Sequence, residues 1–189
     1  MNDAEIRANL HQKLLQKHYS DAETLVINEL GLRHGKHRAD IAVINGRMIG
    51  YEIKSDEDNL SRLEGQIEAY NAVFDRISLV ITEKHLGRAK DMAPPWWGLI
   101  LVCKSRWDRV TFRTLRKMQK NPLTDNLTVA QLLWRQEVIE ILSPSVPQEH
   151  LQKEKRADLY KRLLGMFRSK RLRLSVRECL KKRKNWRCI

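Results

Sequence analysis

The stretch from Ala39 to Lys54 constrains the fold more than any other part of this 189-residue chain. Each half of the stretch is rich in β-branched and apolar residues, which favours two short strands. Asn45-Gly46 lies between the halves, and this dipeptide is typical of tight hairpin turns because both residues tolerate positive φ. The stretch therefore predicts two neighbouring antiparallel strands.

Two acids and a lysine lie on this predicted hairpin. Asp40 is on the first strand, and Glu52 and Lys54 are on the second, where residues i and i+2 point to the same face. Two carboxylates, with the Ile53 carbonyl as a further oxygen ligand, suit Mg²⁺ or Mn²⁺. A neighbouring lysine can orient a water molecule. The pattern predicts a metal site for phosphodiester hydrolysis.

This site requires a particular pairing of the two strands. A two-residue turn would pair Asp40 with Tyr51 and leave Asp40 and Glu52 on opposite faces of the sheet. A three-residue loop at 45–47 would pair Asp40 with Glu52, and a bulge at Gly50 could also bring the two carboxylates level. We expect one of these last two arrangements.

The remaining pattern predicts an α/β fold. Amphipathic helices are expected at residues 3–17, from 56 or 59 to 74, and at 84–92, with strands at 24–30, 77–82 and 98–103. This order favours a mixed sheet flanked by helices. The length allows one domain with a substantial core and a small helical appendage.

Positive charge is concentrated in the second half of the chain. Residues 1–103 contain 13 Lys and Arg against 15 Asp and Glu, whereas residues 104–189 contain 23 against 8. Such a surface usually meets a polyanion, so we expect nucleic acid, and first of all DNA, as the partner. A solvated polar face is the alternative.

We therefore divide the chain by composition. The expected parts are a core at 1–104 and a basic helical extension at 105–189, with a Pro-containing linker at 143–147 and helices at 128–142 and 175–184.

Together these residues resemble the PD-(D/E)XK nuclease superfamily, which includes restriction endonucleases and RecB-type exonucleases. Asp40 matches its first strand acid, and residues 52–54 match its Glu-x-Lys triplet. Gln66 and Tyr70 match the Gln-x-x-x-Tyr motif of the RecB-like branch, and the likeness covers about residues 1–103. It implies a restriction-endonuclease-like sheet and a Mg²⁺-dependent nuclease.

The whole chain looks still more similar to a small bacterial and phage family of that superfamily. This likeness includes Glu-Leu-Gly-Leu at residues 29–32 and Leu-Leu-Trp-Arg at 132–135.

The resemblance implies a role for each site residue. The metal ligands would be Asp40, Glu52, the Ile53 carbonyl and Glu29. The catalytic set would be the same three acids with Lys54 and Gln66. Nucleic acid would be contacted by Tyr70, Arg38 and Arg62. Glu5, on the first helix, is the alternative to Glu29 as the additional acid.

Other classes of protein are disfavoured. The apolar runs are far shorter than the roughly 20 residues that span a bilayer, and no apolar signal region begins the chain, so we expect a cytoplasmic location. Cys103, Cys179 and Cys188 lack the spacing of a zinc site or a disulfide framework. A fold of the same type that binds nucleic acid without turnover is the rival to a nuclease, and pairing of two chains into a homodimer stays open.

Overall fold

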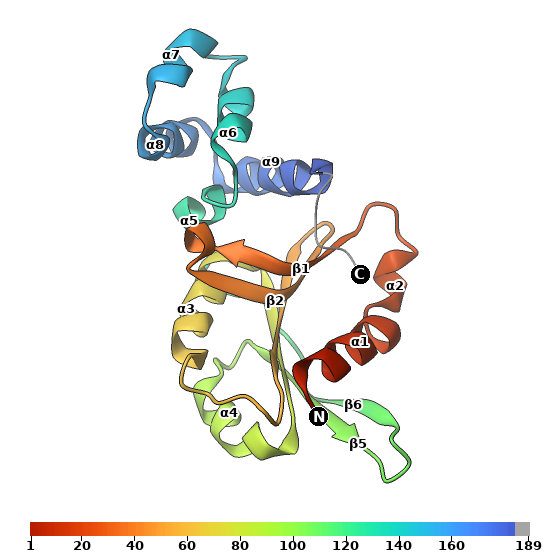
Figure 1. Cartoon of the computed structure of the whole chain (residues 1–189). Helices are drawn as coiled ribbons and strands as arrows, with labels where there is room; N and C mark the ends of the chain where they lie inside the picture. Colours follow the sequence, from red (N-terminus) through yellow and green to blue (C-terminus); the bar gives the residue numbers. More distant parts are fainter. Residues whose placement is uncertain (184–189) are drawn as a thin grey trace.

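A computed structural model describes residues 1–183 and has a mixed α/β architecture (Figure 1). The described residues contain six strands, in one sheet of order β1-β2-β3-β4-β5-β6. The strands are β1 (Leu25–Leu32), β2 (His37–Ile44), β3 (Met48–Lys54), β4 (Arg76–Ile81), β5 (Gly98–Lys104) and β6 (Val110–Arg116). Strands β3, β4 and β5 run parallel, and the other neighbours are antiparallel. The predicted mixed sheet flanked by helices is confirmed.

Helices cover both faces of this sheet. They are α1 (Asp3–Lys13), α2 (Gln16–Tyr19), α3 (Leu63–Val73), α4 (Leu86–Met92), α5 (Asn126–Ala130), α6 (Arg135–Leu142), α7 (Gln148–Lys153), α8 (Arg156–Met166) and α9 (Ser169–Lys182), with short 3-10 turns η1 (Arg33–Gly35) and η2 (Glu83–His85). Helix α1 lies on one face, and α3 and α4 lie on the other (Figure 1). Two predicted helices are shorter than expected. Helix α1 ends at Lys13, and α3 begins only at Leu63.

The alternation along β2 produces two cores. Ile41 and Val43 belong to the cluster that contains Ile6 of α1, whereas Ala42 and Ile44 belong to the cluster that contains α3. All five side chains are completely buried. Since burying one such aliphatic side chain contributes about 1.5–3 kcal/mol, a slip of β2 by one residue would be strongly unfavourable.

The loop that joins β2 to β3 consists of residues 45–47. Ile44 pairs with Met48 across it. The Asn45 amide donates to the Arg47 carbonyl (3.0 Å), and the Arg47 amide donates to Asn45 Oδ1 (3.1 Å). This is the predicted three-residue loop. None of its residues has a positive φ, so the Asn-Gly pair acts through the Asn45 side chain rather than through a left-handed backbone.

The second half differs from its prediction at two places. Residues 110–116 were expected in a helical extension but form strand β6, whose Val, Thr and Phe residues suit a strand that pairs with β5. The predicted helix 128–142 is two helices, α5 and α6. They are separated because the Trp134 amide donates to a Glu137 carboxylate oxygen (2.7 Å) and so begins α6 afresh.

The division of the chain at residue 104 stays a prediction, but the sheet continues beyond it. Buried side chains of the C-terminal helices and of the link between α5 and α6 also belong to the same core cluster as α3: Val129, Leu133, Val138, Leu159, Leu163, Leu172, Val176 and Leu180. The segment 143–147 joins α6 to α7. Helix α9 begins earlier than the predicted 175–184, and residue 184 and Cys188 lie outside the described residues.

Across residues 1–183, no helix combines the length and apolar character that a bilayer crossing requires.

Candidate functional site

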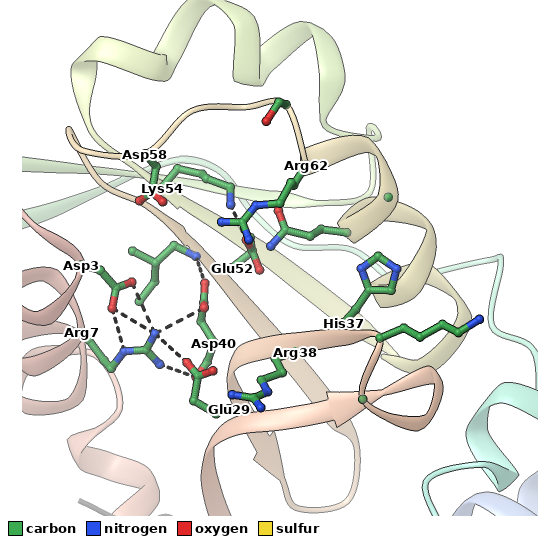
Figure 2. A pocket seen from close by; sticks show the side chains of 16 residues that line it. Asp3, Arg7, Glu29, His37, Arg38, Asp40, Glu52, Lys54, Asp58 and Arg62 are labelled. Atoms are coloured by element: carbon green, nitrogen blue, oxygen red, sulfur yellow. Dashed lines mark hydrogen bonds and ion pairs between the residues drawn. The ribbon is translucent and has the colours of Figure 1, made fainter.

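A pocket of about 760 Å³ lies where β2 and β3 meet the segment that leads into α3 (Figure 2). Its charged lining contains the acids Asp3, Glu29, Asp40, Glu52 and Asp58 and the cations Arg7, Lys36, Arg38, Lys54 and Arg62. Ile53, His37 and Gln66 also line it. The pocket therefore brings together every predicted site residue except Tyr70 and Glu5.

Asp40 and Glu52 form the floor of the pocket. The register of β2 and β3, continued by one residue, places them level with each other. Asp40 Oδ2 accepts a hydrogen bond from the Ile53 amide (2.7 Å), and Glu52 Oε1 accepts one from Lys54 Nζ (2.7 Å). Glu52 and Lys54 are almost completely buried. The Glu-x-Lys triplet is therefore a buried ion pair.

Burial is the largest influence on the pKa values of Asp40 and Glu52. It raises the pKa of Asp40 well above its ordinary value, and the neighbouring Glu52 carboxylate raises it further, against the Ile53 amide and Arg7, which lower it. Burial also raises the pKa of Glu52, although Lys54 and Tyr70 act in the opposite direction. Both carboxyl groups are consequently costly to ionise together.

Tyr70 lies beneath the floor rather than in the pocket. It is completely buried, and its hydroxyl donates to Glu52 Oε2 (2.5 Å) and accepts a hydrogen bond from the Asp40 amide (3.0 Å). This position links helix α3 to both strands of the hairpin. The prediction that Tyr70 contacts nucleic acid does not fit such burial.

Arg7 is a central site residue that the sequence did not indicate. Its guanidinium lies 3.1 Å from an Asp3 carboxylate oxygen, 3.2 Å from Glu29 Oε1 and 3.3 Å from Asp40 Oδ1 (Figure 2). Although burial lowers the pKa of Arg7, these three carboxylates raise it overall. The spacing of Asp3 and Arg7 on one helix was visible in the sequence, but nothing connected that helix to the hairpin.

The structure distinguishes the two candidates for the additional acid. Glu29 lines the pocket, and the register of β1 and β2 places it level with Asp40. Its φ of 58° is unusual for a residue with a side chain and is typical of functional or tightly constrained positions. Glu5 lies elsewhere and pairs with Lys104 (2.8 Å). Glu29 is therefore the acid that belongs to this site.

Gln66 adds an unusual polar atom to the lining. Its Oε1 is buried and, among residues 1–183, has no hydrogen-bond partner. Buried acceptors in folded proteins are almost always satisfied, so an oxygen of this kind needs a water molecule or a ligand.

The family model described as Bacteriophage P4 protein cII matches residues 1–188. The chain belongs to this family. Among curated proteins, protein cII of Enterobacteria phage P4 is 28% identical over 117 residues, which are 62% of this chain and 44% of that protein. The match thus spans less than half the length of that relative.

Among solved structures, a protein of unknown function from Silicibacter pomeroyi is 14% identical and has a TM-score of 0.41, covering 72% of this chain and 89% of that chain.

Membership of the cII family corrects the functional prediction. The resemblance to the PD-(D/E)XK superfamily and its RecB-like branch is wrong as a family assignment, because the cII family accounts for residues 1–188. The predicted nuclease, hydrolase and Mg²⁺-dependent phosphodiesterase activities depended on that assignment and are wrong with it. The catalytic roles given to Asp40, Glu52, Lys54, Gln66 and Glu29 are not retained. In this cII-family chain, Tyr70 joins α3 to the hairpin through its hydrogen bonds with Glu52 and the Asp40 amide.

Proposed function

We propose that this cII-family protein binds nucleic acid, with DNA as the expected ligand, and that the pocket receives part of the sugar-phosphate backbone. The observation that carries the proposal is the rim of the pocket. Lys36, Arg38 and Arg62 line it, are exposed, and have no salt bridge within the described part of the chain. Cations of this kind neutralise phosphates and release condensed counterions, which supplies affinity for any sequence.

The rest of the chain supports the same class of ligand. Residues 104–189 carry 23 Lys and Arg against 8 Asp and Glu, and this part includes strand β6 of the sheet and helices α5 to α9. A strongly positive molecule attracts a polyanion at long range and speeds their association. The rim would then provide short-range contacts.

Binding of a phosphate beside the acidic floor of the pocket requires a further component that neutralises the carboxylates. A phosphate group would be repelled by Asp40 and Glu52 wherever both are ionised, and burial raises the pKa of each. We infer that Mg²⁺ or Mn²⁺ is held there by Asp40, Glu52 and the Ile53 carbonyl. The cation supplies charge neutralisation between the carboxylates and a phosphate.

The residues present fit such a cation only in part. Residues 1–183 contain no group of three or more His, Cys, Asp or Glu arranged as metal ligands. Mg²⁺ usually keeps several waters and binds through one or two carboxylates plus phosphate oxygens, so a two-carboxylate site is adequate when phosphate is bound. The unpaired Gln66 Oε1 would accept a hydrogen bond from one of these waters. No hydrolytic step is assigned to the pocket.

The proposal is tested by fluorescence anisotropy with labelled duplex and single-stranded DNA at several salt concentrations. Arg38→Gln/Arg62→Gln should weaken binding and lower the slope of log affinity against log salt by about 2, since each lost phosphate contact removes about one. Arg88→Gln/Lys90→Gln removes the same charge from exposed positions on α4 and should leave the slope unchanged. Absence of binding by the wild type to either DNA would overturn the proposal, and equal slopes for both variants would remove the pocket from it.

The cation is tested separately by thermal unfolding. Adding Mg²⁺ at pH 8 should raise the melting temperature of the wild type, because a ligand that binds only the folded state stabilises it. Asp40→Asn removes a ligand and should abolish this increase. An equal increase in wild type and variant would place the cation elsewhere.

A further inference from the structure

A second cationic groove lies at the opposite end of the β2–β3 hairpin. It has a volume of about 320 Å³ and is lined by Arg47 of the hairpin loop, Arg76 at the start of β4, Lys120 after β6 and Arg177 of α9. Four segments that are far apart in the sequence thus each contribute one cation to the same groove. We call these four residues the hairpin-end groove.

One acid, Asp75, also lines the hairpin-end groove, but it is already engaged. Its Oδ2 accepts a hydrogen bond from the Met48 amide (2.8 Å), and its Oδ1 lies 3.1 Å from Nη1 of Arg173. Asp75 therefore ties α9 to the sheet, and its charge is matched by Arg173. Asp75 therefore neutralises little of the positive charge of the four cations.

The four cations have few other partners. Arg76 donates to the Met118 carbonyl (3.4 Å), which is a neutral acceptor. Arg47, Lys120 and Arg177 form no salt bridge in the described range 1–183. Like charges held around one hollow repel one another, and a multivalent anion would relieve that repulsion.

The hairpin-end groove is separate from the pocket that contains Asp40 and Glu52. Strand β3 begins at Met48, directly after Arg47. Glu52 is five residues beyond Arg47, so at about 3.3 Å per residue the two residues are roughly 17 Å apart along the strand. Cations also continue from the groove along α9. Arg177 is shared with a neighbouring hollow whose charged lining also contains Arg168, Lys170, Arg171 and one acid, Glu178.

We propose that the hairpin-end groove binds phosphate groups. Its cations converge on one hollow, and guanidinium groups match phosphate oxygens through paired N–H donors. This inference rests on the proposed function, so the phosphates belong to a nucleic-acid backbone. The groove is then a second contact with the same nucleic acid. Free polyphosphate is the other source of this chemistry.

The experiment compares the full-length wild type with Arg47→Gln/Arg177→Gln, using inorganic tripolyphosphate by calorimetry and labelled duplex DNA by anisotropy. The variant should bind tripolyphosphate at least tenfold more weakly, and its salt slope for DNA should fall by about 2. Arg88→Gln/Lys90→Gln serves as the matched control and should behave as the wild type. Arg47→Lys/Arg177→Lys keeps the charge and should restore most of the salt slope, which separates loss of charge from misfolding.

The outcomes separate this site from the proposed function. If the wild type and Arg47→Gln/Arg177→Gln bind DNA with the same slope and tripolyphosphate with the same affinity, the groove is not a phosphate site, while DNA binding stands. If the wild type binds tripolyphosphate but no DNA, and Arg47→Gln/Arg177→Gln loses the tripolyphosphate binding, the proposed function fails. The groove is then a phosphate site with free polyphosphate as its ligand. If the wild type binds neither, both are overturned.

Discussion

At the scale of single residues, Asp40 shows how tertiary neighbours set the chemistry of a carboxyl group. Its side chain is 19% exposed, and it receives a hydrogen bond from the Ile53 amide. Burial and the Glu52 charge nevertheless outweigh that bond and the Arg7 guanidinium, so the pKa of Asp40 is raised. Ionising this residue therefore reduces the stability of the folded protein.

We expect Asp40→Asn to alter how the free energy of unfolding depends on pH. A folded pKa above the unfolded value means that the folded state keeps a proton which the unfolded chain has released. The wild type should thus lose stability as pH rises above about 4 and through the folded pKa, by at most about 1.4 kcal/mol per pH unit for one proton. Asn cannot ionise, so the free energy of unfolding of the variant should fall less than that of the wild type over this pH range.

Urea unfolding without divalent cations, from pH 4.5 to 8, measures this difference. Parallel stability curves for wild type and Asp40→Asn would contradict the raised pKa.

Gly50 is constrained by the close approach of α3 to β3. A Cβ added there would lie 2.7 Å from Phe74 Cδ2 and 2.9 Å from Tyr70 Cδ1, and both rings are completely buried. We expect Gly50→Ala to lower the free energy of unfolding by about 1–3 kcal/mol through overpacking. Gly46→Ala, in the adjoining loop, meets nothing within 4 Å and should change it little. Denaturant unfolding compares the two, and equal effects would show that α3 moves aside without cost.

At the scale of elements, helix α9 combines a basic surface with a place in the core. Leu172, Val176 and Leu180 recur at every fourth residue and are completely buried, while Leu174 on the same helix is 49% exposed. This stripe packs into the cluster shared with α3, α5 and α8. The helix is thus held by apolar contacts and by the Arg173–Asp75 ion pair. Other cations of α9, such as Arg177, form no salt bridge within residues 1–183 and can serve a ligand surface.

Two substitutions within α9 test this arrangement. Leu172→Ala should lower the free energy of unfolding by about 2–5 kcal/mol, as for other buried leucines. Leu174→Ala makes the same chemical change at an exposed position and should cost about 0.5 kcal/mol or less. Urea unfolding followed by circular dichroism gives both values. A small effect for Leu172→Ala would mean that α9 contributes little to the core.

At the scale of the whole molecule, the two halves of the chain share one sheet and one core. Strand β5 pairs with β6 across the predicted boundary at residue 104, and α5 contacts both α3 and α9. The helical part lies over the end of the sheet near β1 (Figure 1). This arrangement favours a single cooperative unit over two independent domains.

A chain truncated after Lys104 tests the predicted division. Without β6 and the C-terminal helices, β5 becomes an open edge and apolar side chains that face α5 become exposed, so the fragment should aggregate or unfold. Size-exclusion chromatography and circular dichroism would detect this. A monomeric, folded fragment 1–104 would support the division by composition instead.

Sequence patterns predicted those parts of the molecule that depend on local physics. The β-branched halves of 39–54 form β2 and β3, and the amphipathic spacing of 63–73 forms α3. The three-residue loop is one of the two arrangements, with a bulge at Gly50, that were expected to bring Asp40 level with Glu52. The same local patterns did not predict β6 or the break between α5 and α6. Strand β6 depends on pairing with β5, and the break depends on the Glu137 carboxylate that accepts from the Trp134 amide. Local patterns also produced the wrong family, since short motifs of a few polar residues occur in unrelated proteins.

The sequence by itself determined the order of the first five strands and the main helices between them, the hairpin with its acids and lysine, and the excess of positive charge after residue 103. Only the tertiary structure decided what those charges do. It brought Arg7 onto Asp40 and Glu29, buried Tyr70 beneath Glu52, and assembled the hairpin-end groove from four separate segments. The physical reason is that burial and proximity set the strength of electrostatic interactions, and both depend on residues far apart in the chain.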